Sequence, residues 1–268
     1  MNIRMLRDKT VWITGASSGI GLEMTRLAAS AGAKLYLFSS RIKALEEAAG
    51  IAAAEGALSV RYEAVDLSDS DAAVEASLRA LKQGGTPDYL ILNAGISQRS
   101  MAAETDLSVT RNILELNFFG TVAMARTVLP FMMEQGGGHI AVTSSVTGEF
   151  GFPMRSAYAA SKHALHGYFE SVGLEYASEG ILVTLVVPGR IRTAISINSL
   201  TADGGKHGKM DPGQEKGMDA ALCAEKYWKA VIRGKHKAVI GGFDTIMVFF
   251  HRFLPGVFRA IAYRTSPV

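Results

Sequence analysis

The chain has 268 residues, a formal net charge of +3 and a single cysteine. This length suits one large α/β domain, and one cysteine excludes an intramolecular disulfide framework. The mild charge, without an arginine-rich tract, excludes the composition typical of nucleic-acid binders. The six histidines lack a spacing typical of metal ligands, so we predict no metal site.

The amino terminus is charged and lacks the apolar core of a signal peptide. No run approaches the ~18 to 20 consecutive apolar residues that a membrane span needs. We therefore expect a cytoplasmic protein. From here the chain alternates between predicted strands and predicted helices.

Residues 11–13 are predicted to form the first strand, and a glycine-rich turn at 14–21 leads into a helix that ends near residue 31. Backbone N–H groups at a helix amino terminus can hold a phosphate, and glycine allows its close approach. Because a strand precedes the turn and a helix follows it, the pattern predicts nucleotide binding. The residues expected to contact the cofactor here are Gly15, Ser17, Ser18, Gly19, Ile20 and Gly21.

The second strand, 35–38, is followed by Ser39, Ser40 and Arg41. A carboxylate at this place would bind the ribose hydroxyls of NAD(H) and repel a 2′-phosphate. Two hydroxyls and a guanidinium therefore favour NADP(H), with NAD(H) as the second choice. Arg41 could instead be only a solvated residue at the start of the next helix, 41–55.

The third strand, 60–65, ends at an aspartate, and the fourth, 89–92, ends at a small turn that contains glycine. Asp66 could accept a hydrogen bond from an adenine amino group, or it could cap the helix predicted at 69–82. The turn lies at the edge where open α/β sheets bind their ligands. The cofactor contacts expected at these two strand ends are Asp66, Leu67, Asn93, Ala94 and Gly95.

A long helix is predicted at 107–134 and carries Asn117 in its middle. This amide could be a satisfied buried group or a solvated one. The apolar run 140–142 that follows is bounded by glycines and serines, which suits a strand covered on both faces. Ser144 and Ser145 come directly after it.

Tyr158 and Lys162 lie four residues apart in a helix predicted at 156–178, so both project from one face. A free tyrosine has a pKa of roughly 10, and a nearby ammonium would stabilise the phenolate. Lowering that pKa by about 3 units requires about 4 kcal/mol of preferential interaction with the phenolate. The pair predicts an acid–base centre, although a tyrosine and a lysine on an exposed helix face have the same spacing.

The apolar strand predicted at 181–187 ends at Pro188 and Gly189. Residues 189–217 are rich in glycine and lysine and lack periodicity, and long loops of this kind are commonly lids. We therefore predict a lid over the substrate. A helix at 219–233 and a short strand at 237–240 complete the alternation.

The carboxyl-terminal extension, 243–268, combines apolar aromatic residues with basic ones and is interrupted by Pro255 and Gly256. A kinked amphipathic pair of helices could contact a membrane surface through 243–264 or cover a hydrophobic substrate pocket. It could equally pack on its own sheet or on a partner subunit.

Taken together, these motifs resemble the short-chain dehydrogenase/reductase superfamily from about residue 7 to 242. The resemblance is carried by Thr14-Gly15-x-x-x-Gly19-x-Gly21, Asn93-Ala94-Gly95, Asn117, Ser145, Tyr158-x-x-x-Lys162 and Pro188-Gly189 with Thr193. It implies one α/β domain, 1–268, with a Rossmann-type, doubly wound, mostly parallel seven-stranded sheet and helices on both faces. It also implies a homodimer or homotetramer built on the helices 107–134 and 156–178.

Carried to this chain, the resemblance implies that Tyr158 is the general acid and base between a ketone and an alcohol. Ser145 would bind the substrate oxygen, since it lies thirteen residues before Tyr158 and fits better than Ser144. Lys162 would lower the tyrosine pKa and bind the nicotinamide ribose, and Asn117 would hold a water of the proton relay. Contacts to the nicotinamide are implied for Pro188, Gly189, Ile191 and Thr193.

The function so implied is an NADP(H)-dependent oxidoreductase that interconverts a ketone or aldehyde and a secondary alcohol. The extension is similar to those of family members acting on steroids, sphingoid ketones or other lipids, which implies a hydrophobic small-molecule substrate. The alternative is a non-catalytic NADP(H)-binding sensor or regulatory protein with the same fold. The complete set of Asn117, Ser145, Tyr158 and Lys162 favours the enzyme.

Overall fold

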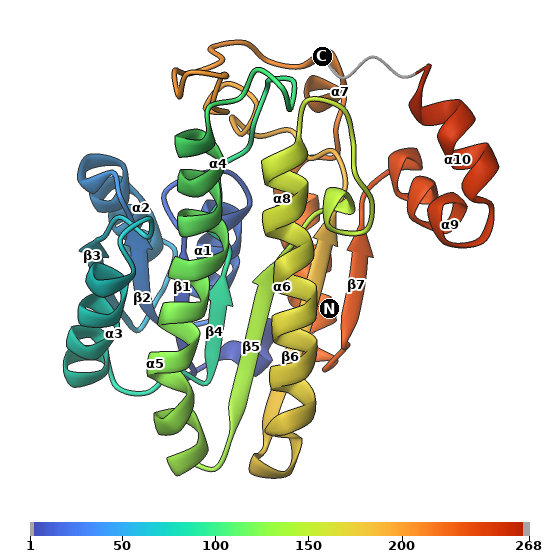
Figure 1. Ribbon diagram of the computed structural model, residues 1–268. Coiled ribbons are helices and arrows are strands. Elements are labelled where there is room, and N and C mark those ends of the chain that lie inside the picture. Colours follow the sequence, from blue (N-terminus) through green and yellow to red (C-terminus); the bar gives the residue numbers. More distant parts are fainter. Residues whose placement is uncertain (1–2, 265–268) are drawn as a thin grey trace.

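Seven parallel strands form one sheet in the order β3-β2-β1-β4-β5-β6-β7 in the computed structural model, which describes residues 3–264 (Figure 1). The strands are β1 (Thr10–Thr14), β2 (Lys34–Ser39), β3 (Ser59–Ala64), β4 (Tyr89–Leu92), β5 (Gly138–Thr143), β6 (Ile181–Pro188) and β7 (Lys237–Ile240). The strand order reverses between β1 and β4, and the crevice at such a reversal is where open α/β sheets bind ligands. The predicted Rossmann-type sheet is confirmed.

Helices cover both faces of the sheet, with α1, α2 and α8 on one face and α3, α5 and α6 on the other. The helices are α1 (Gly19–Ser30), α2 (Ile42–Ala54), α3 (Ser70–Gly84), α4 (Leu107–Leu114), α5 (Gly120–Glu134), α6 (Ser156–Glu175), α7 (Pro212–Glu215), α8 (Ala220–Ile232), α9 (Ile246–Phe253) and α10 (Pro255–Ala262). Strand residues alternate between two apolar cores: Ile13 packs under α1 and α8, while Trp12 packs on the opposite face. Burial on both faces explains the nearly continuous apolar strands.

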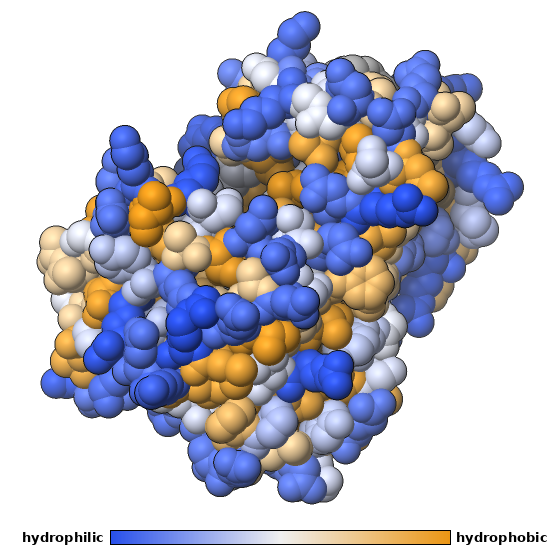
Figure 2. Space-filling view, turned by 60° about the vertical axis from the view of Figure 1, so that its left-hand side comes forward, coloured by the Kyte–Doolittle hydropathy of each residue, from blue (hydrophilic) through white to orange (hydrophobic). Residues whose placement is uncertain are grey.

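The helix predicted at 107–134 is interrupted by a π-helical turn, Glu115–Phe119, between α4 and α5. By length and composition alone, this stretch is apolar enough to cross a membrane, although it contains no unbroken apolar run of that length. Met124, Val128 and Met132 are fully buried against the sheet, and that packing accounts for its apolar composition. Over the face shown in Figure 2, apolar residues lie interspersed with hydrophilic ones.

The carboxyl-terminal extension predicted at 243–268 is described as far as residue 264, and its last four residues lie outside the described part. It forms a 3-10 turn, Phe243–Thr245, and then α9 and α10, which pack on each other as a hairpin. The break falls at Leu254, directly before Pro255. The hairpin stands beside the carboxyl end of β7, at the right of Figure 1.

Candidate active site

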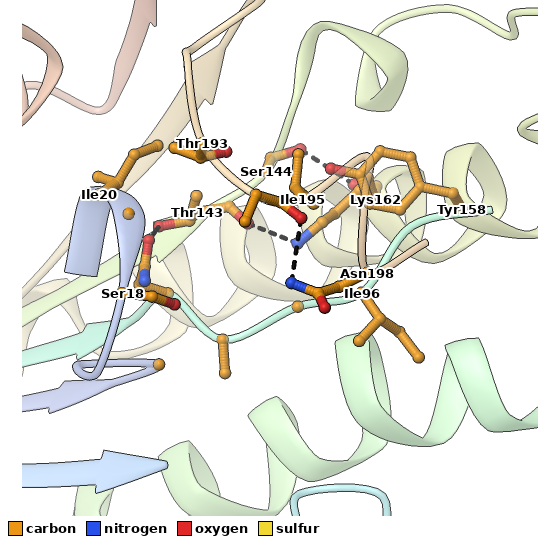
Figure 3. Close-up of a pocket in the computed structure, with 16 residues that line it drawn as sticks. Ser18, Ile20, Ile96, Thr143, Ser144, Tyr158, Lys162, Thr193, Ile195 and Asn198 are labelled. Carbon is orange, nitrogen blue, oxygen red and sulfur yellow. Dashed lines mark hydrogen bonds between the residues drawn. The ribbon is translucent and has the colours of Figure 1, made fainter. Parts of the chain in front are cut away.

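A cavity of ≈ 180 Å³ lies at the carboxyl ends of β1, β4 and β5, next to the point where the strand order reverses (Figure 3). Segments far apart in the sequence meet there, because the carboxyl ends of parallel strands share one edge of the sheet. The lining residues are Gly15, Ser18, Gly19, Ile20, Asn93, Ala94, Gly95, Ile96, Thr143, Ser144, Tyr158, Lys162, Thr193, Ala194, Ile195 and Asn198.

The glycine-rich turn between β1 and α1 forms one wall of this cavity. Gly15 has φ 63°, and a Cβ there would lie 3.0 Å from Ala94 Cα. A Cβ on Gly21 would lie 2.2 Å from the carbonyl oxygen of Gly15. Ser18 precedes α1 but makes no side-chain cap, so this helix start lacks the usual hydroxyl partner for its N–H groups. The turn therefore fits the pyrophosphate of a dinucleotide.

Arg41 lies against the same turn. Its Nη2 donates to Ser18 Oγ at 3.0 Å and to Ser17 Oγ at 3.4 Å, and the Ser17 and Ser39 hydroxyls are 2.7 Å apart. Ser40 is exposed beside them. Arg41 therefore does more than precede α2. Together with the Ser17, Ser18 and Ser39 hydroxyls, it forms a polar, cationic corner at the end of β2.

Asp66 does not cap a helix, so that alternative was wrong. Its Oδ1 accepts from the Ser68 N–H at 2.9 Å and from Ser68 Oγ at 2.8 Å, whereas α3 is capped by Asp69. The Leu67 side chain is buried in the core beneath the helices. Neither Asp66 nor Leu67 lines the cavity.

The turn after β4 is held by the Thr14 hydroxyl, which accepts from the N–H groups of Asn93 at 2.9 Å and Ala94 at 3.0 Å. Gly95 is packed so closely that a Cβ would lie 3.2 Å from both Asn117 Oδ1 and Lys162 Nζ. Glycine at this position therefore leaves room for the Asn117 amide and the Lys162 ammonium.

Asn117 is fully buried in the π-helical turn. Its Oδ1 accepts from the Ile96 N–H at 2.8 Å, and its Nδ2 donates to the Ile96 carbonyl and to Ser161 Oγ, both at 2.9 Å. The amide is therefore a satisfied buried group, which decides between the two alternatives left by the sequence. π-Turns inside helices are frequent at functional sites.

The two serines after β5 have different partners. Ser145 lies close enough to Tyr158 to lower the pKa of the phenol, and its Oγ accepts from the Thr147 N–H at 3.2 Å. Ser144 Oγ instead donates to the Lys162 carbonyl at 3.2 Å (Figure 3). It also lies 2.7 Å from His166 Nε2. The structure thus places Ser145, rather than Ser144, at the phenol.

The charge balance at Tyr158 differs from the prediction. Burial raises the pKa of Tyr158, while the Ser145 hydrogen bond and the charges of Arg99 and Arg155 act in the opposite direction. Lys162 Nζ donates to the Thr143 carbonyl at 2.8 Å and lies 5.8 Å from the tyrosine ring centroid, and burial lowers its own pKa to about 8. The charges of Arg99 and Arg155 at the phenol were not foreseen from the sequence, and the effect of Lys162 on the tyrosine pKa stays a prediction.

A buried ion cluster beside Tyr158 was missed entirely. Asp211 Oδ2 accepts from Arg99 Nε at 2.8 Å and Nη2 at 2.6 Å, and from Arg155 Nη2 at 3.0 Å. Arg99 and Asp211 are each 6 % exposed. The partners are 112 and 56 positions apart, so no local pattern signals the pairing. Through Asp211, the segment predicted as a lid is tied to the rim of the site.

The segment after β6 is fixed from two sides. A Cβ on Gly189 would lie 2.1 Å from Asp244 Oδ2, which also accepts from the Arg190 N–H at 2.6 Å. Ile191 is buried, and Thr193 faces Gly19 across the cavity, where a Cβ on Gly19 would lie 3.1 Å from Thr193 Cγ2. Pro188, the residue before Gly189, is the last of β6.

Residues 9–203 match the family model for short chain dehydrogenases. The chain belongs to the short-chain dehydrogenase/reductase superfamily. A relative, dehydrogenase/reductase SDR family member 7B of Danio rerio, is 38% identical over 269 residues, which is 97% of this chain and 86% of that protein. The family makes the chain an oxidoreductase with a nicotinamide cofactor and a small-molecule substrate.

Two solved structures share the fold. A short-chain dehydrogenase/reductase from Burkholderia phymatum in complex with NAD has a TM-score of 0.81 at 23% identity and covers 98% of both chains. An alcohol dehydrogenase from Thermococcus sibiricus complexed with 5-hydroxy-NADP has a TM-score of 0.76 at 23% identity, covering 88% of this chain and 97% of that one. Proteins with this fold have thus been solved with NAD and with 5-hydroxy-NADP bound.

No group of three or more histidine, cysteine, aspartate or glutamate side chains within residues 3–264 is arranged to hold a metal ion. His166 pairs with Ser144, and His163 Nδ1 lies 2.8 Å from the Ala159 carbonyl. Both histidines of the predicted helix are thereby assigned to local packing.

Proposed function

We propose that this chain is an NADP(H)-dependent oxidoreductase that interconverts a ketone or aldehyde and a secondary alcohol, with Tyr158 as general acid and base. The observation that carries the proposal is that Tyr158 and Lys162 both line the cavity that the glycine-rich turn borders, with Ser145 close enough to lower the pKa of the phenol. Two hydroxyl donors, from Ser145 and Tyr158, can stabilise a substrate carbonyl oxygen as it gains negative charge.

In reduction, the cofactor supplies the hydride when bound. Tyr158 then donates its phenolic proton to the substrate oxygen, and Ser145 holds that oxygen by a hydrogen bond. Lys162 would hold the nicotinamide ribose, while Asn117 fixes the backbone at Ile96 and would hold a water of the proton relay toward solvent. In oxidation the phenolate accepts the proton. Because Arg99 and Arg155 favour that phenolate, they offset part of the cost of its burial.

The NADP(H) preference is supported by Arg41, which lies with Ser17, Ser18 and Ser39 at the turn. No carboxylate stands among these residues to repel a 2′-phosphate. The remaining proposed contacts are those assigned from the sequence, with Asp66 and Leu67 at the adenine and residues 188–193 at the nicotinamide.

A hydrophobic, lipid- or steroid-like substrate is supported by the apolar lining contributed by Ile96 and Ile195. Residues 189–217 act as the substrate lid in this proposal. We further propose a cytoplasmic homodimer or homotetramer built on α5 and α6, where Phe131 and Leu174 are exposed at 37% and 82%.

A second candidate is the non-catalytic NADP(H)-binding sensor, which would need only the glycine-rich turn and the cavity that it borders. The two are separated by measuring oxidation of NADPH and of NADH in parallel over small, steroid and long-chain ketones. Turnover with NADPH on a long-chain or steroid ketone supports the oxidoreductase and its substrate class. Tight NADPH binding without turnover on any ketone, aldehyde or alcohol supports the sensor, and turnover with NADH alone contradicts the cofactor assignment.

A further inference from the structure

The α9–α10 hairpin presents large apolar side chains to solvent. In α9, Ile246, Phe249 and Phe253 are spaced i, i+3 and i+7, so they share one side of the helix, and Phe249 and Phe253 are 53% and 61% exposed. Leu254, between the two helices, and Val257 of α10 are also apolar and are 46% and 45% exposed. We call these five residues the hairpin face.

The charge of this segment has one sign. Residues 245–268 contain the arginines Arg252, Arg259 and Arg264 and neither aspartate nor glutamate. Arg252 is exposed, and its guanidinium carbon lies 5.7 Å from the ring centroid of Phe253, at the margin of the hairpin face. The acidic residue before the segment, Asp244, is engaged by the Arg190 and Gly242 N–H groups. An apolar surface flanked by arginines is complementary to a partner that is both apolar and negatively charged.

The hairpin is attached to the body at points that leave this face open. Phe258 is buried against Phe150 with ring centroids 5.0 Å apart, and His251 lies 5.9 Å from the same ring. At its base, the Asp244 carboxylate holds the Arg190 N–H. Phe150 belongs to the segment between Ser145 and Tyr158, so the hairpin touches the chain that builds the active site, at the carboxyl end of the sheet (Figure 1).

We propose that the hairpin face docks onto the surface of a lipid bilayer that contains anionic headgroups. The aromatic and aliphatic side chains enter the boundary between headgroups and acyl chains, and the arginines contact the headgroups. A second copy of the chain is a poorer occupant, because a two-fold contact would bring the arginines of both copies together with no carboxylate in either hairpin to pair with them. This proposal does not depend on the catalytic one.

Flotation with vesicles tests the proposal on the full chain. We expect wild type to bind vesicles of phosphatidylcholine with phosphatidylglycerol and to bind phosphatidylcholine alone far more weakly. Raising the salt concentration should weaken binding, because exposed charges are screened. Arg252→Gln should weaken binding about fivefold, the effect of one basic residue near such a surface.

Phe249→Ser with Phe253→Ser should lower the affinity at least about tenfold, since two large apolar side chains no longer enter the bilayer. The matched control is Leu58→Ser with Leu78→Ser, because these leucines are 54% and 48% exposed at the far edge of the sheet. That control should bind as wild type does. Both double variants should keep the wild-type melting temperature, which excludes misfolding as the cause.

The proposal is overturned if wild type does not float with anionic vesicles, or if the two double variants lose binding equally. Light scattering after size-exclusion chromatography measures the molecular mass and so tests whether a second copy of the chain covers the hairpin face instead. If the Phe249 and Phe253 substitutions lower the molecular mass and leave vesicle binding unchanged, the hairpin face is an interface between copies of this chain.

Discussion

Removing the carboxylate of Asp211 is expected to destabilise the protein strongly. Asp211→Asn keeps the size of the side chain but removes the carboxylate that pairs with the Arg99 guanidinium, in a site where Arg99 is 6 % exposed. Breaking a buried ion pair by removing one partner costs about 3 kcal/mol or more, because the remaining charge stays desolvated. For a chain of this size that corresponds to a fall in Tm of roughly 6 to 12 °C.

The assay is urea denaturation at pH 7 together with a thermal melt, and Asp203→Asn is the matched control. Asp203 lies in the same segment but is exposed, and its carboxylate accepts hydrogen bonds from the nearby Thr201 hydroxyl and Gly205 N–H. Its substitution should change the free energy of unfolding by less than about 1 kcal/mol. If Asp211→Asn costs no more than Asp203→Asn, the ion cluster does not anchor this segment and the reasoning fails.

Three further predictions concern packing, pH and the cofactor. Gly120→Ala should lower the free energy of unfolding by about 1 to 3 kcal/mol, since its Cβ would lie 1.9 Å from the Leu67 carbonyl oxygen. The control is Gly167→Ala, where a Cβ would have nothing within 4 Å. It should be neutral or stabilise α6 by up to about 1 kcal/mol. Burial lowers the pKa of His139 from 6.5 to about 4. Between pH 6.5 and 4, His139 therefore takes up a proton only in the unfolded chain. As a result, about 3 kcal/mol of the folding stability present above pH 6.5 is lost as the pH falls to 4. Arg41→Ala should weaken NADPH binding about tenfold and leave NADH binding unchanged, because one charge-assisted contact to the 2′-phosphate is lost.

Each of these has a simple refutation. Equal unfolding free energies for the two alanine variants would show that the start of α5 tolerates a side chain. A His139→Leu variant whose stability falls as steeply as wild type between pH 6.5 and 4 would assign the acid sensitivity to other groups. Parallel loss of NADPH and NADH affinity in Arg41→Ala would show that the guanidinium supports the turn rather than the phosphate.

The strands of the sheet could be predicted closely because the sequence signals that define them lie within or directly beside each strand. Buried parallel strands are short apolar runs, and glycine or proline marks their ends, so the strand at 89–92 was placed to the residue. The helix boundaries came within a few residues for the same reason. The π-turn at Glu115–Phe119 was not foreseen, because it lies inside a stretch that the sequence pattern predicts as one continuous helix.

The electrostatics of the site could not be predicted, because they depend on groups distant in sequence. The i, i+4 spacing of Tyr158 and Lys162 indicates a shared helix face, but the lysine Nζ bonds the Thr143 carbonyl on β5. The charges that act on the phenol come from Arg99 and Arg155. Asp66 shows the same limit at short range, since Asp69, three residues on, is the cap.

The central claim is that Tyr158 transfers the proton, and the most direct measurement compares wild type with Tyr158→Phe. NADPH binding is measured by fluorescence titration, and turnover by NADPH oxidation with the best ketone of the panel. We expect the variant to bind NADPH with wild-type affinity and to lose at least about 10² in kcat. Wild-type turnover in Tyr158→Phe would contradict the account.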